Sequence, residues 1–195
     1  MKKTFLFVSF LILSLSFMIG CQTDEANKNV NTESTNNKVI NNQDIDYERL
    51  GKIAIDKVNQ LDIDDIEIRK WVIRAVAGAE TFNQTLTDSE ILKKATDMMN
   101  EDEKWFKLAE KYGVKIPDTE VRKYIDELYS NIETIKQLND FANGLGMDLK
   151  EYVYTFDFDR FKKDLTWVEL NPILQKKYET DDNNELIEKY SEELK

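Results

Sequence analysis

The sequence contains no histidine, one cysteine, two prolines and six glycines in 195 residues. Without histidine, the chain cannot form a Ser-His-Asp triad, a Cys-His pair or a histidine-ligated metal centre. The lone cysteine, Cys21, excludes an internal disulfide. No glycine-rich phosphate loop is present. Carboxylates could still pair for acid–base chemistry, but the composition predicts a protein that is not an enzyme and needs no cofactor.

Positive charge is also scarce. The chain has 27 Lys and Arg against 38 Asp and Glu, a formal charge of −11. This balance argues against nucleic acid as a partner, because phosphates need basic groups, and against electrostatic binding to anionic lipid head groups. An acidic surface would favour basic polypeptides over acidic ones. The acidic cluster at 62–67 is interpreted as a solvated helix start rather than an acid–base site.

The N-terminus carries a targeting signal. Two lysines precede an uncharged apolar run, residues 4–19, which ends at Gly20 and Cys21; this pattern is typical of a secretory signal peptide over 1–20. Residues 18–21, MIGC, resemble the lipobox of bacterial lipoproteins, with Met in place of the usual Leu. The resemblance implies that Cys21 is acylated on sulfur and anchors the chain at the extracytoplasmic face of the cell membrane. The alternative is a transmembrane anchor with an incidental cysteine, although the run is short for a span of ~20 residues.

Residues 22–44 are rich in Asn, Thr, Asp and Lys and contain no aromatic residue. Such a segment cannot bury enough apolar surface to offset the entropy of ordering, so it is predicted to be a flexible tether. The remaining residues, from 45, suffice for one domain. Their helical periodicity predicts an all-α bundle of about five helices over 45–180, followed by a short acidic helix within 181–195.

Local signals mark several helix ends. Thr87 and Glu90 have the spacing of a capping box, which opens a helix, and Gly113 suits a left-handed cap at the end of that helix. Residues 44–65 fit either a helix or a strand, and their spacing favours a helix. Pro172 lies inside the last long helix and is expected to kink it or end it locally.

Two segments, 107–128 and 137–165, resemble the N-terminal domain of the SurA and PrsA foldases. The first has a helix that ends in Ala-x-x-x-Gly, followed by an aliphatic-x-Pro-Asp-x-Glu-Val helix start. The second has an apolar helix end, a glycine and a closing helix. The matching positions are Ala109, Gly113, Ile116, Pro117, Asp118, Glu120 and Val121, then Leu138, Phe141, Leu145, Gly146, Leu149 and Tyr152. Gln60 departs from the pattern, because the family has a Val-Asn-Gly turn there.

The resemblance implies a helical domain that binds unfolded or extended exported polypeptide. Full-length members also carry a parvulin domain that isomerises prolyl bonds. That domain is expected to be absent, because too few residues follow 180 and parvulin sites use histidine. The expected function is therefore chaperone-like binding without isomerase activity. A structural or regulatory lipoprotein subunit that docks one folded membrane partner is the alternative.

The stretch EYVYTFDFDRF, residues 151–161, contains five aromatic rings. In α-helical register, Tyr154, Phe158 and Phe161 share the core stripe, whereas Tyr152 and Phe156 lie on a second line. Either a neighbouring helix covers that second line, or it belongs to an exposed apolar patch of the kind that marks binding surfaces. Tyr152 and Phe156 are therefore the candidate peptide-binding residues, because ring faces hold extended peptide without requiring a particular sequence.

Overall fold

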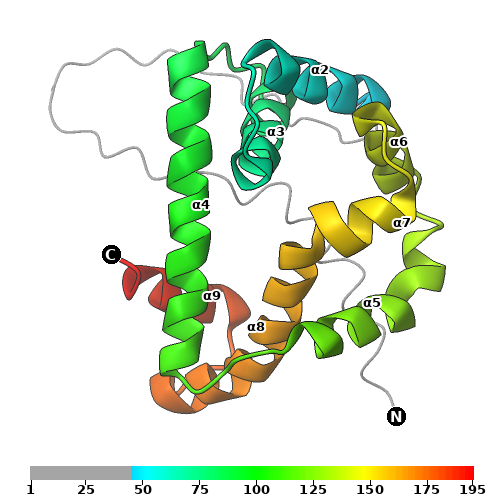
Figure 1. Ribbon diagram of the computed structural model, residues 1–195. Coiled ribbons are helices and arrows are strands. Elements are labelled where there is room, and N and C mark those ends of the chain that lie inside the picture. Colours follow the sequence, from blue (N-terminus) through cyan, green and yellow to red (C-terminus); the bar gives the residue numbers. More distant parts are fainter. Residues whose placement is uncertain (1–44) are drawn as a thin grey trace, which may run out of the picture. The chain divides into compact units, whose positions relative to one another are not determined.

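The computed structural model describes residues 45–195, which form α-helices joined by short turns and contain no strand (Figure 1). The all-α prediction is confirmed for this part of the chain. The expected signal peptide 1–20, the acylated Cys21 and the tether 22–44 lie outside the described residues. The helices are α2 (Tyr47–Gln60), α3 (Ile66–Thr81), α4 (Asp88–Lys111), α5 (Asp118–Ile132), α6 (Lys136–Leu145), α7 (Leu149–Glu151), the π-helical turn η2 (Tyr152–Phe156), α8 (Phe158–Tyr178) and α9 (Asn183–Glu192).

The helices outnumber the five that were expected, because two long helices are divided. The chain bends after Ile132, which separates α5 from α6, and η2 separates α7 from α8. The ambiguous segment 44–65 is helical, as its spacing favoured, and forms α2. The acidic C-terminal segment forms α9 and belongs to the same compact unit as the other helices, Asp46–Lys195.

The predicted helix ends follow from local hydrogen bonds. The backbone N–H of Thr87 donates to the Glu90 carboxylate at 2.8 Å, and the N–H of Glu90 donates to the Thr87 hydroxyl at 3.3 Å, which completes the capping box of α4. Gly113, just after α4, has a left-handed φ of +80°. α8 continues through Pro172 to Tyr178, so this proline does not end the helix.

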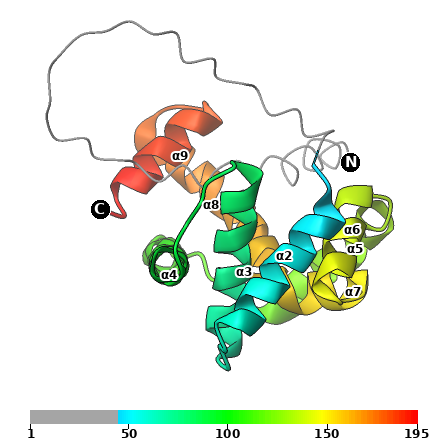
Figure 2. The same ribbon diagram turned by 90° about the horizontal axis from the view of Figure 1, so that it is seen from above.

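Two glycines allow α2 and α6 to cross at backbone contact. A Cβ on Gly51 would lie 2.6 Å from the Phe141 carbonyl oxygen, and a Cβ on Gly144 would meet the carbonyl oxygen of Glu48. Both glycines are buried. α2 also packs on α3, which in turn packs on α4, and Figure 2 shows α4 nearly end-on beside α3. This arrangement gives α3 the central position in the N-terminal part of the unit.

Aromatic residues join the C-terminal half of α4 to α8 and α9. The Tyr190 ring lies edge-on to Trp105, with centroids 5.4 Å apart, and edge-on to Trp167 at 6.0 Å. Its hydroxyl donates to the Trp105 carbonyl oxygen at 2.8 Å. α4 is therefore held near its N-terminus by α3 and near its C-terminus by α9, and the face between these two contacts borders a groove.

Candidate functional site

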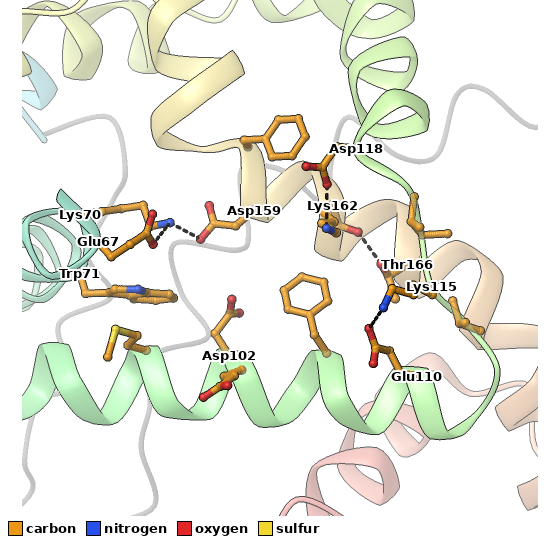
Figure 3. Close-up of a pocket in the computed structure, with 16 residues that line it drawn as sticks. Glu67, Lys70, Trp71, Asp102, Glu110, Lys115, Asp118, Asp159, Lys162 and Thr166 are labelled. Carbon is orange, nitrogen blue, oxygen red and sulfur yellow. Dashed lines mark hydrogen bonds and ion pairs between the residues drawn. The ribbon is translucent and has the colours of Figure 1, made fainter.

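A groove of about 440 Å³ opens between α3, α4, α8 and the segment that joins α4 to α5 (Figure 3). Its surface combines apolar side chains with a charged rim. The apolar lining consists of Trp71, Met99, Phe106, Val114, Ile116 and Phe158. Met99, Phe106 and Phe158 are only half-buried, so part of each side chain is available to a bound molecule.

Helical spacing brings these residues to one place. On α4, Met99, Asp102, Glu103, Phe106 and Glu110 recur every three or four residues, so one face of the helix borders the groove. On the opposite wall the first turns of α8 supply Phe158, Asp159, Lys162 and Thr166. Figure 3 shows Glu67, Lys70 and Trp71 of α3 at one end, with Lys115 and Asp118 at the other.

The direction of the α8 side chains depends on η2. The backbone N–H of Asp157 donates to the Tyr152 carbonyl oxygen at 2.8 Å, five residues back. A π-helical turn contains one residue more than an α-helical turn. This extra residue rotates the side chains that follow by about 100° relative to an uninterrupted α-helix. The rings before and after this turn therefore do not keep the α-helical register that their spacing implied.

Of the two alternatives for Tyr152 and Phe156, the structure shows the one in which neighbouring helices cover the rings. Both rings are buried, at 2% and 7% exposure, so they do not form a surface patch. Tyr154 and Phe158 are half-buried instead of fully in the core, and Phe158 lines the groove. Phe161, expected in the core, is buried. The extra residue of η2 turns one pair of rings inward and brings Phe158 to the groove.

Neighbouring helices cover the two buried rings. Phe141 of α6 lies edge-on to Tyr152, with centroids 6.0 Å apart, and Tyr152 stacks on Phe156 at 5.3 Å. The guanidinium of Arg74 lies 5.4 Å from the Phe156 ring centre. This is the covered arrangement that the sequence left open as one of two possibilities.

Arg74 fixes the junction between η2 and α8. Its guanidinium is buried and donates two hydrogen bonds of 2.6 Å to the Asp159 carboxylate. It also donates to the carbonyl oxygen of Phe156 and to the carboxylate of Asp157, both at 3.2 Å. The carbon of the guanidinium lies 4.8 Å from the Trp71 ring centre. Trp71 of α3 and Asp159 of α8 both line the groove. Arg74 contacts both side chains, so it helps to fix the positions of these two walls.

The charges in this region depend on each other. Burial alone would raise the pKa of Asp159, but the hydrogen bonds and charge of Arg74 lower it to about 2. Burial opposes the charge of Arg74, yet its hydrogen bonds to Asp159 and the two carboxylate charges raise its pKa. Asp164 differs from Asp159, because no cation among the described residues donates a hydrogen bond to it: burial, with the nearby charge of Asp157, raises its pKa to about 7.

Sequence reasoning missed both the groove and Arg74. The available signal was a lone arginine within the apolar stretch WVIRAVAG of α3, since a charged side chain on a buried helix is normally paired. Its partners could not be read from the sequence, because Asp157 and Asp159 lie more than 80 residues further along the chain.

The polar part of the groove lining consists of carboxylates, lysines and one threonine. Within 45–195, no cluster of three or more His, Cys, Asp or Glu residues is placed to hold a metal ion. None of the helices in this part of the chain combines the length and apolar character needed to cross a membrane. No protein-family model matches the sequence, and neither the curated proteins nor the solved structures gave a match.

Proposed function

We propose that this chain is a lipid-anchored extracytoplasmic protein that holds unfolded or extended exported polypeptide, without covalent chemistry or prolyl isomerase activity. The observation that carries the proposal is the groove between α3, α4 and α8, with half-buried apolar side chains at its surface. The lipobox and the resemblance to the SurA and PrsA N-terminal domain support the same function from the sequence.

The size and lining of the groove suit a few side chains of a flexible chain. The groove volume of about 440 Å³ lies within the ~300–1,000 Å³ of ordinary ligand sites. A groove of this size is too small for a folded domain. Burying apolar area contributes roughly 25 cal/mol per Å². Met99 adds an adaptable side chain that can pack against ligands of different shape. Binding of this kind requires no particular sequence.

Substitution of one groove ring tests the proposal. Phe158→Ala removes a half-buried ring from the groove wall, so we expect it to weaken the suppression of aggregation of an unfolded client, measured by light scattering. Ile173→Ala is the matched control, since Ile173 lies on the same helix and is exposed at 38% but does not line the groove. Equal activity of the two variants, or no suppression by the wild-type chain, would contradict the proposal.

The alternative, a subunit that docks one folded membrane partner, predicts a different result in cells. A photoreactive amino acid placed at Phe158 should crosslink to many exported chains during their secretion if the groove holds unfolded polypeptide. Capture of one folded membrane protein in stoichiometric amount would instead assign the chain to the structural or regulatory class.

A further inference from the structure

Each carboxylate that lines the groove, among the described residues, has a cation within ion-pair distance, and Lys70 lies within this distance of both Glu67 and Asp159. The shortest N–O distance in these pairs ranges from 2.6 to 3.1 Å. The pairs are Glu67–Lys70, Asp102–Lys163, Glu103–Lys107, Glu110–Lys115, Asp118–Lys162 and Asp159–Arg74. Although the whole chain has a formal charge of −11, the formal charges of these pairs cancel.

Several of these pairs connect different walls of the groove. Lys163 of α8 bonds to Asp102 of α4 at 2.7 Å. Lys162 of α8 bonds to Asp118, the first residue of α5, at 2.8 Å, as Figure 3 shows. Arg74 joins α3 to Asp159 of α8. These three cations are therefore part of the structure of the walls. A lysine from a bound polypeptide would have to replace a paired cation to reach any of the groove carboxylates.

Such a replacement exchanges one ion pair for another and leaves a wall cation without a partner. Electrostatic complementarity gives specificity when one surface has unpaired charge of a single sign, and the described lining of the groove presents none. The general acidity of the chain, which suggested basic clients, does not extend to this surface. What remains for recognition is the apolar lining around Met99, Phe106 and Phe158.

We propose that the groove binds uncharged, apolar stretches of unfolded polypeptide and does not distinguish basic from acidic flanking residues. This inference rests on the proposed function and defines its substrate class. Because apolar contacts supply the affinity, binding is expected to be nearly independent of ionic strength, whereas attraction between exposed charges weakens as salt screens it.

Three short synthetic peptides and the purified full chain test this inference. The first peptide contains only Leu, Phe, Ser and Asn; in the other two, the same serines are replaced by Lys or by Glu. Fluorescence anisotropy of labelled peptides should give dissociation constants for the Lys and Glu peptides within about twofold of each other, at both low and high potassium chloride. Preferential, salt-sensitive binding of the Lys peptide overturns the inference and leaves the proposed function intact. Failure of all three peptides to bind overturns both.

A variant can create the selectivity that the wild-type groove lacks. Lys115→Gln leaves Glu110 without its cation, and because both side chains are exposed, at 77% and 50%, the fold should not depend on the pair. One unpaired exposed carboxylate should make the Lys peptide bind about two- to fivefold more tightly than the Glu peptide. Lys52→Gln, which breaks the exposed Glu48 pair on α2 away from the groove, is the control and should show no preference.

If Lys115→Gln leaves the two peptides equal, ion pairing does not set selectivity and the inference is wrong. A second copy of the chain is the other possible occupant of an apolar groove. Sedimentation velocity of the full chain distinguishes this case: a dimer that excludes the uncharged peptide would overturn the inference, whereas a monomer that binds it supports it.

Discussion

The guanidinium of Arg74 connects α3 with the start of α8 through Phe156, Asp157 and Asp159. It occupies the point at which the helix is interrupted, where it satisfies a backbone carbonyl oxygen as well as two carboxylates. A buried ion pair of this kind is costly to break on one side, because the remaining charges stay buried without a partner.

Arg74→Met should therefore lower the free energy of unfolding by ~3–5 kcal/mol, measured by urea denaturation. Lys93→Met removes one partner of the exposed Lys93–Asp97 pair on α4 and should change it by less than ~1 kcal/mol. If the two variants unfold at the same urea concentration, the Arg74 network contributes no more to stability than a surface pair.

Asp164 and Asp159 should give the stability of the protein opposite slopes with pH. The pKa of Asp164 is about 7 in the folded chain, above the ~3.9 of an unfolded chain, so protonated Asp164 favours folding. Its contribution is complete below pH ~4 and is lost as the pH rises through 7. The pKa of Asp159 is lowered to about 2, so its contribution is present above pH ~4 and disappears as the pH falls toward 2.

Asp164→Asn should remove the decline in stability between pH 4 and 7, because the amide has no proton to lose. Urea denaturation across that range measures the effect, and at pH 8 the variant should be more stable than the wild type. Asp97→Asn, on the exposed face of α4, should retain the decline. A wild-type stability that is level from pH 4 to 7 would show that Asp164 does not titrate in this interval.

At the scale of elements, η2 determines which rings support the fold. Phe156 and Phe161 are both buried, at 7% and 2% exposure, although an uninterrupted α-helix would have separated them. Phe156→Ala and Phe161→Ala should each cost ~3–5 kcal/mol, whereas Phe158→Ala should cost much less because its ring is only half-buried. Thermal melts of the three variants decide the register: equal melting of Phe156→Ala and Phe158→Ala would contradict the π-helical turn.

The crossing of α2 and α6 gives a second test at this scale. Gly144→Ala places a methyl group against the backbone of α2 and should lower the free energy of unfolding by ~1–3 kcal/mol. Gly78 offers the matched control, since it lies within α3 and a Cβ there meets nothing within 4 Å. Gly78→Ala should raise stability by ~0.5–1 kcal/mol, and a thermal melt in which both variants shift in the same direction would exclude the close crossing.

How far the sequence predicted these elements depends on the range of the interactions. The capping box of Thr87 and Glu90 and the stop at Gly113 were predictable, because both depend on residues a few positions apart. The interruption at η2 was not, because Arg74 of α3 and Phe141 of α6 contact its residues through the tertiary packing of other helices. The groove was missed for the same reason, since its lining comes from helices far apart in the sequence.

At the scale of the whole molecule, the net negative charge bears on how the chain could attach to a membrane. Loss of the two N-terminal lysines with a signal peptide would change the formal charge from −11 to −13, which would repel anionic head groups. In the function proposed above, attachment to a membrane would come from lipid, and two acyl chains at ~0.8 kcal/mol per buried methylene would hold the chain firmly.

Cys21→Ser should therefore move the protein from the membrane fraction to the medium or the soluble fraction and abolish labelling with a radioactive or clickable palmitate analogue. The reason is that serine offers no thiol for acylation at the position where MIGC resembles a lipobox. Ser16→Ala, in the same apolar run, is the control and should leave both localisation and labelling unchanged. If Cys21→Ser stays in the membrane at its full precursor length, residues 4–19 act as a transmembrane anchor and the interpretation of MIGC as a lipobox is wrong.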